Sequence, residues 1–229
     1  MMQIYKRIEK GLIVSCQALE GEPMFGSDIM AKMAFAAFLG GARGIRANSP
    51  EDIKMIKQKV DLPVIGLYKR HYPSSEVYIT PTYFDALQVA EAGADMIAID
   101  ATKRIRPREN IGEIIDKIHT ELKLPVLADI ATIEEAVFAR KNGADLVATT
   151  LFGYTEETKF TDFSKIELIQ NLTRIVDCPV IAEGNIRSPQ QAVEALEAGA
   201  FAVVVGSAIT RPLDITKWFV EEMQYKFEI

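Results

Sequence analysis

Short runs of apolar residues recur along the whole chain, separated by glycine, proline and charged residues. Most runs are continuously apolar rather than alternating, which is typical of parallel strands that are covered on both faces. Charged segments with helical spacing lie between them. We therefore predict eight strands, at residues 12–17, 44–47, 63–69, 96–101, 125–130, 146–151, 179–185 and 202–209.

The segments between the predicted strands carry signals for the start and end of helices. In "SPEDIKMIKQKV", Ser49 is a candidate N-cap and Pro50 stands at the first helical position. In "TIEEAVFARKNG", Thr132 and Glu135 have the spacing of a capping box, and Gly143 ends the segment. Similar phrases open strands ("DLPVIG", "KLPVLAD", "DCPVIAEG") and close helices ("EAGAD", "KNGAD", "EAGAF"). The chain is thus built from a repeated strand and helix unit.

Eight such units in 229 residues predict an α/β fold of the (β/α)8 TIM-barrel type, as a single domain over residues 1–229. A doubly wound sheet is the alternative. It would more often carry a glycine-rich dinucleotide loop after the first strand, where this chain has "SCQALEGEPM". The last segment, "ITKWFVEEMQYKF", has apolar residues near helical spacing. We expect this helix to cover the barrel, with a homodimer interface as the alternative role.

Composition and charge narrow the classes of function. The net charge of −6 argues against a nucleic-acid-binding surface, but a local arginine cluster could still hold an anionic small molecule. Two cysteines, Cys16 and Cys178, and two histidines provide neither a disulfide framework nor the spacing of a metal site. No apolar run reaches the ~18 residues of a membrane span, and the first residues lack a signal-peptide pattern. We expect a cytoplasmic protein with reduced thiols and no membrane partner.

Polar residues that end otherwise apolar strands are the candidate site, because a barrel brings the carboxyl ends of its strands to one mouth. Any one of them could be a solvated start of a loop. A convergent set from most of the strands is harder to explain in that way. The set comprises Gln17, Arg46, Lys69, Asp100, Asp129, Thr149 and Glu183, with Arg211 just beyond the last strand.

The loops after the last two strands predict a phosphate site. "AEGNIRSPQ" and "VGSAITRP" place Gly184, Gly206 and Ser207 where backbone N–H groups and a helix N-terminus can approach an anion. Arg211 could add bidentate contacts to the phosphate. The alternative is that these glycines serve only tight turns.

Lys69 and Glu183 are the candidate pair for proton transfer. A lysine at a barrel mouth near Arg46 or Arg211 would have its pKa lowered by desolvation and by like charge, as a general base near neutral pH requires. The same neutral amine could instead attack a carbonyl and form a Schiff base, and the residues alone leave both uses open. Asp129 could hold the lysine or bind sugar hydroxyls.

These residues stand in motifs that resemble the N-acetylmannosamine-6-phosphate 2-epimerase family. The likeness runs from about Gly11 to Trp218 through "IVSCQA", "GARGIRANSPEDI", "PVIGLYKR", "AIDATKRIRP", "LADIAT", "GADLVATTLFGYT", "PVIAEGNIRSPQQA" and "VVVGSAITRP". The resemblance implies a phosphate-binding TIM barrel that interconverts N-acetylmannosamine 6-phosphate and N-acetylglucosamine 6-phosphate in sialic-acid and amino-sugar catabolism. It also implies that no nucleotide or redox cofactor takes part.

The resemblance further implies roles for the candidate residues. Lys69 would take the C2 proton of the open-chain sugar, and Glu183 would serve as the opposing acid or as the acid/base of ring opening. Gln17, Arg46 and Asp129 would position the sugar, while Arg211 would anchor the phosphate together with Gly184, Gly206 and Ser207. Two other functions stay open at this stage: a Schiff-base-forming phosphosugar lyase or synthase, and a phosphosugar-binding protein without catalysis.

Overall fold

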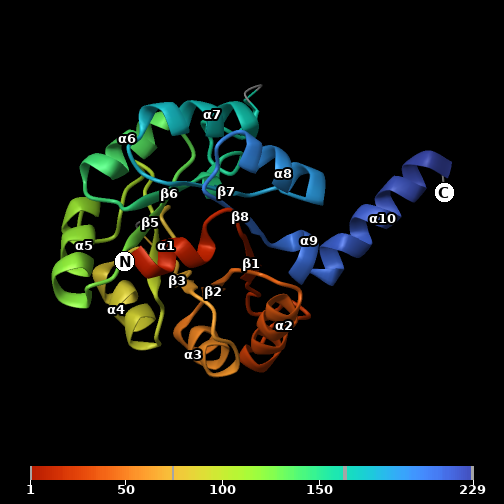
Figure 1. The fold of residues 1–229 in the computed structure, drawn as a ribbon, viewed down its shortest axis with the longest axis horizontal. Coiled ribbons are helices and arrows are strands. Elements are labelled where there is room, and N and C mark those ends of the chain that lie inside the picture. Colours follow the sequence, from red (N-terminus) through yellow and green to blue (C-terminus); the bar gives the residue numbers. More distant parts are fainter. Residues whose placement is uncertain (1, 74, 162–163, 228–229) are drawn as a thin grey trace.

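The fold is a closed barrel of eight parallel strands that pair in chain order, with β8 returning to pair with β1 (Figure 1). This computed structural model describes residues 2–73, 75–161 and 164–227. The TIM-barrel fold class is confirmed, and a strand forms at each of the eight predicted places. Two predictions are too long at their ends: residues 149–151 form a 3-10 helix and residues 207–209 belong to a short α-helix. The strands are β1 (Leu12–Cys16), β2 (Gly44–Asn48), β3 (Val64–Leu67), β4 (Met96–Asp100), β5 (Val126–Asp129), β6 (Leu146–Ala148), β7 (Val180–Glu183) and β8 (Ala202–Val205).

Helices surround the barrel in an outer ring (Figure 1). The predicted caps form: the hydroxyl of Ser49 accepts the N–H of Asp52 at 3.3 Å, and Thr132 and Glu135 make a full capping box. The helices are α1 (Met2–Ile8), α2 (Ser27–Leu39), α3 (Pro50–Lys59), α4 (Tyr83–Glu91), α5 (Ile111–Lys117) with η1 (Ile118–Leu122), α6 (Ile133–Lys141), η2 (Thr149–Leu151), α7 (Lys165–Ile175), α8 (Pro189–Glu197), α9 (Ser207–Thr210) and α10 (Pro212–Phe227).

The alternation of side chains along each strand decides which residues reach the mouth of the barrel. Leu67, Leu127 and Ile181 belong to the cluster of apolar side chains that fills the barrel interior. Successive side chains of a strand point to opposite faces, so the residue two positions later points inward as well. Lys69 and Asp129 each stand two positions after such an interior residue, and so does Glu183 after Ile181. Their inward direction therefore follows from the apolar pattern that fills the barrel.

Helix α10 departs from the sequence-based expectation. We expected it to cover the barrel, but none of its sixteen residues is buried, and Figure 1 shows it projecting away from the barrel. Apolar side chains remain exposed along its length, among them Phe219 at 68% and Met223 at 55%. The expectation that this helix covers the barrel wall is therefore wrong, because the helix continues from α9 outward instead of folding back.

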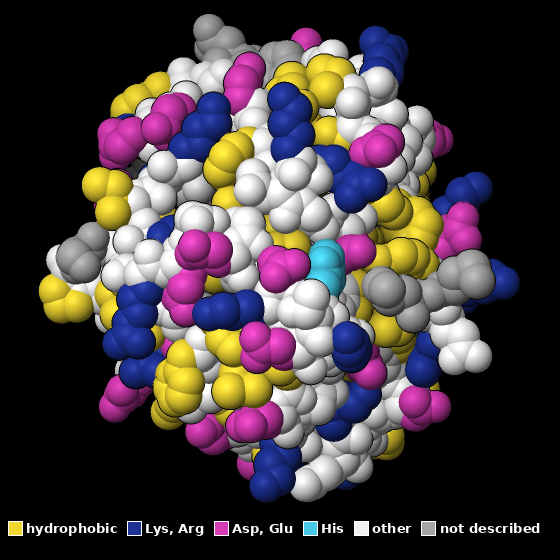
Figure 2. Space-filling view, turned by 90° about the vertical axis from the view of Figure 1, so that its left-hand side faces the viewer, with side chains coloured by type: hydrophobic (Ala, Val, Ile, Leu, Met, Phe, Trp, Pro, Cys, Tyr) yellow, Lys and Arg dark blue, Asp and Glu magenta, His cyan; other side chains and the backbone are white. Residues whose placement is uncertain are grey.

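One face of the barrel shows a mixture of side chains that is ordinary for a protein surface. On the side that lies at the left of Figure 1, acidic and basic side chains are interspersed and apolar ones form only small groups (Figure 2). Among the residues that the structure describes, no helix has both the length and the apolar character needed to cross a membrane.

Candidate active site

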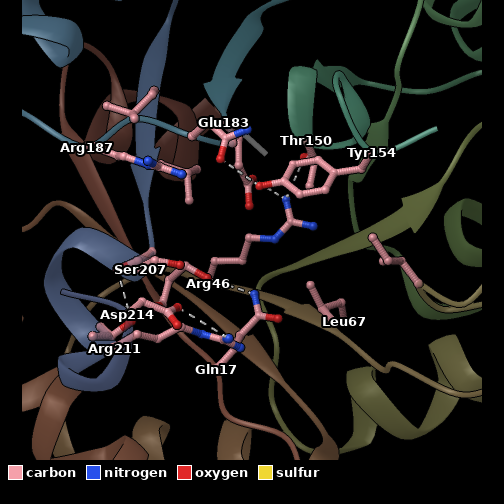
Figure 3. A pocket seen from close by; sticks show the side chains of 18 of the residues that line it. Gln17, Arg46, Leu67, Thr150, Tyr154, Glu183, Arg187, Ser207, Arg211 and Asp214 are labelled. Carbon is pink, nitrogen blue, oxygen red and sulfur yellow. Dashed lines mark hydrogen bonds and ion pairs between the residues drawn. The ribbon is translucent and has the colours of Figure 1, made fainter. Parts of the chain in front are cut away.

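A cavity of about 530 Å³ opens at the carboxyl ends of the strands (Figure 3). The structure brings together eight of the eleven residues that the sequence indicates for the site. Asp100 and Thr149 lie outside the cavity, and Asp129 lies behind Arg46 and is fully buried. The residues that line the cavity are Gln17, Arg46, Lys69, Glu183, Gly184, Gly206, Ser207 and Arg211.

Arg46 is the centre of the site, and its side chain reaches into the cavity from β2 (Figure 3). Its guanidinium donates to both carboxylate oxygens of Asp129, at 2.9 Å from Nη1 and 2.5 Å from Nη2. Nη1 also donates to the carboxylate of Glu183. Thr150 completes the group, because its hydroxyl donates to Asp129 at 2.5 Å. The arginine is 1% exposed, so these contacts hold it in one geometry.

The charges of this group are strongly coupled. Burial alone would lower the pKa of Arg46, but Asp129 and Glu183 outweigh it and raise the pKa, so the guanidinium stays charged. Burial raises the pKa of Glu183, a shift that Arg46 opposes and the nearby Asp129 reinforces. The pKa of Glu183 is thus raised above that of a free carboxyl group, which favours its use as an acid in proton transfer.

Lys69 stands just past the end of β3, the strand that pairs with β2 and so lies beside Arg46. Its backbone N–H donates to the side-chain oxygen of Asn48 at 2.8 Å, which fixes the direction of the residue. Its ammonium has no hydrogen-bond or ion-pair partner among the described residues. Burial, followed by the charges of Arg46 and Arg211, lowers the pKa of Lys69 to about 8. About a tenth of the lysine is therefore neutral at pH 7, far more than for an exposed lysine.

Two buried polar atoms in the cavity have no partner among the residues that the structure covers. The side-chain oxygen of Gln17 is one, although its amide nitrogen donates to the hydroxyl of Ser15 at 2.9 Å. The Nε of Arg46 is the other. Leaving a buried polar atom without a partner costs about 1–3 kcal/mol. An acceptor and a donor left open in one cavity indicate that a polar ligand completes them.

The part of the cavity that the loops after β7 and β8 form has the character of an anion site. Gly184 has a φ of 93° and opens the loop after β7, while Gly206 immediately precedes helix α9. Arg211 follows α9 and forms ion pairs with Glu22 at 3.1 Å and with Asp214 at 3.8 Å. The side chains of Arg211, Glu22 and Asp214 are each about 30% exposed, so this guanidinium is not enclosed as that of Arg46 is.

Several residues of the site were missed by the sequence analysis. Tyr154, Arg187 and Trp218 line the cavity, and the guanidinium of Arg187 lies 4.5 Å from the ring centre of Trp218. Lys165 was missed as well, and its ammonium donates to the backbone of Glu183. Arg187 and Tyr154 stand within the quoted motifs "NIRSP" and "FGYT", but a residue on a loop has no strand pattern that reveals its direction.

Two candidates from the strand ends do not line the cavity. Asp100 is held by the guanidinium of Arg104 at 2.7 Å and by the hydroxyl of Thr102 at 2.7 Å, so it organises the loop after β4. Thr149 accepts the N–H of Glu183 at 3.0 Å and donates to its carbonyl at 2.9 Å. Both are structural supports, and Thr149 acts directly on a predicted site residue.

Metal and thiol chemistry find little support in the described part of the chain. No group of three or more histidine, cysteine, aspartate or glutamate residues there could hold a metal ion. Cys16 and Cys178 are free thiols, and burial raises the pKa of Cys16 to about 12 and that of Cys178 to about 11. Neither is therefore a reactive thiolate at neutral pH.

Comparison with known proteins gives consistent matches over most of the chain. A family described as "Putative N-acetylmannosamine-6-phosphate epimerase" matches residues 30–225. A relative from Caldanaerobacter subterraneus named "Putative N-acetylmannosamine-6-phosphate 2-epimerase" is 54% identical over 96% of this chain and 93% of its own length. A relative of the same name from Shouchella clausii is 50% identical over 98% of this chain and 100% of its own length.

Solved structures agree with these relatives. The N-acetylmannosamine-6-phosphate 2-epimerase from Clostridium perfringens matches with a TM-score of 0.92 and 46% identity, over 95% of each chain. Thiamine phosphate pyrophosphorylase from Pyrococcus furiosus matches with a TM-score of 0.60 at 20% identity, over 95% of this chain and 98% of its own. The second likeness shows the shared barrel fold alone.

Proposed function

The chain belongs to the N-acetylmannosamine-6-phosphate epimerase family, and from this membership we propose that it interconverts N-acetylmannosamine 6-phosphate and N-acetylglucosamine 6-phosphate. The observation that carries the proposal beyond the family name is the mouth of the barrel. There a lysine with a pKa of about 8, whose ammonium has no partner among the described residues, shares a cavity with a buried carboxyl group that Arg46 holds. In its reaction class the protein is an isomerase of the epimerase type, with a role in the use of sialic acid and amino sugars.

The reaction requires the inversion of one carbon of the sugar. The hydrogen on C2 is barely acidic in the ring form, whereas in the open chain C2 lies beside the C1 aldehyde. Removing the proton then gives an enolate whose negative charge rests on O1. The protein must therefore open the ring, take the proton, stabilise the enolate and return a proton to the other face.

Lys69 and Glu183 are the residues that we assign to proton transfer. Because its ammonium has no partner in the described chain and its pKa is lowered to about 8, Lys69 can accept the C2 proton without first breaking an ion pair. Glu183 lies at the end of β7 and lines the same cavity, so it can act as the opposing acid or as the acid/base of ring opening. Each proton moves between a named side chain and the substrate, and no redox change occurs.

Arg46 and Gln17 are assigned to the sugar itself. The unpaired Nε of Arg46 is a fixed donor that can stabilise the charge on O1 of the enolate. A preorganised donor of this kind contributes about 2.7–4 kcal/mol in related chemistry. The open oxygen of Gln17 is an acceptor for the N–H of the acetamido group or for a hydroxyl. Asp129 acts through Arg46, because both of its oxygens are engaged by that guanidinium.

The phosphate is assigned to the loops after β7 and β8. Arg211 supplies positive charge there, and Gly184, Gly206 and Ser207 line the same end of the cavity. Helix α9 begins at Ser207, so its first N–H groups lack intrahelical partners. Anchoring the phosphate at this end leaves the sugar chain to extend toward Lys69 and Glu183.

Incubation with N-acetylmannosamine 6-phosphate in deuterated water tests the proposal. We expect proton NMR to show the gluco epimer with deuterium at C2. Conversion without deuterium, or no conversion by the folded protein, would overturn it. Borohydride trapping of a covalent adduct on Lys69 would instead favour a Schiff-base enzyme, and tight binding without turnover would favour a phosphosugar-binding protein.

We also infer that helix α10 pairs with a second copy of the chain. Its sixteen residues are all unburied, and its exposed apolar side chains need a cover that its own barrel does not provide. Light scattering should give the mass of a homodimer, and Phe219→Asp should reduce it to the monomer. A monomeric wild-type protein at micromolar concentration would contradict the inference. The apolar side chains concerned are Leu213, Phe219, Val220, Met223, Tyr225 and Phe227.

A further inference from the structure

Lys165 is the first residue of helix α7, and its side chain is directed back to the end of β7. Its ammonium donates to the carbonyl of Glu183 at 2.5 Å and to the carbonyl of Gly184. These two carbonyls belong to successive residues at the point where the strand ends. The lysine therefore closes a clamp between the start of one helix and the end of the strand that carries the candidate acid.

The position of this lysine is unfavourable for the helix itself. A positive charge in the first turn of a helix is repelled by the positive end of the helix dipole. Burial adds a second cost, because it lowers the pKa of Lys165 to about 8 although Glu183 opposes the shift. A residue that served only to start α7 would avoid both costs. We therefore look for the role of Lys165 at the end of β7, where its ammonium donates to two carbonyls.

The backbone that Lys165 grips needs to be held. Gly184 has a φ of 93° and Asn185 a φ of 52°, so two successive residues take left-handed conformations. A Cβ on Gly184 would lie 2.7 Å from the Nζ of Lys165, which shows how closely the amine approaches. The hydroxyl of Thr149 also donates to the carbonyl of Glu183, at 2.9 Å. Two donors thus fix the residue whose side chain faces the substrate.

The charge of Lys165 also acts on the carboxyl group. Its positive charge is among the influences that lower the pKa of Glu183, against the rise caused by burial. Lys165 does not line the cavity, so it reaches the substrate only through Glu183 and the loop that follows. This is the geometry of a residue that positions and tunes another.

We propose that Lys165 is a positioning residue for acid–base chemistry at the mouth: its ammonium clamps the carbonyls of Glu183 and Gly184 and stabilises the carboxylate of Glu183. The kinetic part of this inference rests on the proposed epimerase function. The effect on the ionisation of Glu183 does not, because it can be measured without substrate.

Carbon NMR of protein labelled with [δ-¹³C]glutamate tests the effect on Glu183, whose signal is the one missing from Glu183→Gln. In Lys165→Met we expect its titration midpoint to rise by about half a unit or more, because the positive charge is lost. Lys165→Arg keeps the charge and should keep the midpoint near that of the wild type. Lys159→Met is the matched control, since Lys159 lies in the preceding loop, where its ammonium pairs with the exposed Glu156 and lies 5.1 Å from the ring centre of the exposed Phe160.

The turnover number of folded protein tests the effect on positioning. Lys165→Met should lower kcat about 10²-fold, since a small misplacement of a reacting group costs that much, whereas Lys159→Met should leave kcat unchanged. Should Lys165→Met fail to fold, Lys165→Gln, which can still donate to one carbonyl, must show the same rise in midpoint. An unshifted midpoint in the neutral variants, or an unchanged kcat, would overturn the proposal. Loss of the proposed function would appear separately, as an inactive wild type.

Discussion

The ends of strands β3 and β7 face one cavity, but they present their reactive groups in opposite ways. At the end of β3, hydrogen bonds hold the backbone. The backbone N–H of Lys69 donates to the side-chain oxygen of Asn48, and the backbone N–H of Tyr68 donates to the hydroxyl oxygen of Thr80 at 3.1 Å. The ammonium of Lys69 remains without a partner in the described chain. At the end of β7, both backbone and side chain are held, because Glu183 contacts Arg46, Thr149 and Lys165.

The candidate base therefore has a free ammonium in the described chain, whereas the candidate acid is fixed by its hydrogen bonds. An amine without an ion pair can take a proton at no cost in broken contacts, and burial together with nearby arginines lowers its pKa to about 8. The carboxyl group of Glu183, in contrast, is held in one direction by Arg46, and the charge of that arginine opposes the rise in pKa that burial causes. Rigid backbone on both sides therefore serves two different purposes.

Removing the amine of Lys69 should have the largest effect on the reaction rate. Lys69→Met should lower kcat by about 10³–10⁴-fold, the upper part of the range for a general base, and should abolish exchange of the C2 hydrogen with deuterated water. The side chain keeps its length, so binding of the phosphosugar should remain detectable by calorimetry. Lys54→Met on the exposed side of α3 is the matched control and should behave as the wild type. Exchange at the native rate in Lys69→Met would refute the assignment.

Weakening the buried group around Arg46 should have the next largest effect, on the free energy of unfolding. Asp129→Asn removes a charge from the buried group around Arg46, and we expect the free energy of unfolding to fall by about 3 kcal/mol, the low end for a broken buried ion pair. Urea denaturation measures this change. Asp177→Asn removes a carboxylate from an exposed pair with Arg140 and should leave stability unchanged within error. Equal effects of the two substitutions would contradict the view that Arg46 is locked by its partners.

The sequence predicts the side chains at the ends of the strands better than those that reach the mouth from helices. Apolar alternation places Lys69, Arg46 and Glu183 inside the barrel, because the strand period is fixed once the core is known. Lys165 cannot be found in this way. It comes from the start of a helix, and its contact with the end of β7 depends on how the loop between β6 and α7 folds.

The role of Asp129 and the course of α10 illustrate the same limit. A strand pattern shows that Asp129 points inward, but not that Arg46 comes between it and the cavity. The apolar residues of α10 indicate a surface to be covered, but not which surface covers them. Direction along a strand is local information, whereas these outcomes depend on contacts between distant segments.

The ionisation of Lys69 should set the pH dependence of the reaction. Because the base must be neutral and its pKa is about 8, kcat/KM should rise with pH and level off above that value. At one unit below the midpoint, only about a tenth of the lysine is neutral, so activity near pH 7 should be about a tenth of the plateau. Rates measured from about pH 6 to about pH 10 test this. A profile that falls through pH 8 would show that the protonated lysine is the active form.

The smallest effect should come from a charge that reaches Lys69 from the rim. Glu22 raises the pKa of Lys69 and pairs with Arg211 at 3.1 Å. Glu22→Gln removes the negative charge but keeps an acceptor for the N–H of Leu19. We therefore expect the midpoint of kcat/KM to move to lower pH by a fraction of a unit, which makes the reaction about twofold faster near pH 7. Glu20→Gln, in the same loop, should leave the profile unchanged. A shift to higher pH would mean that freeing Arg211 disturbs the mouth more than its charge favours the neutral amine.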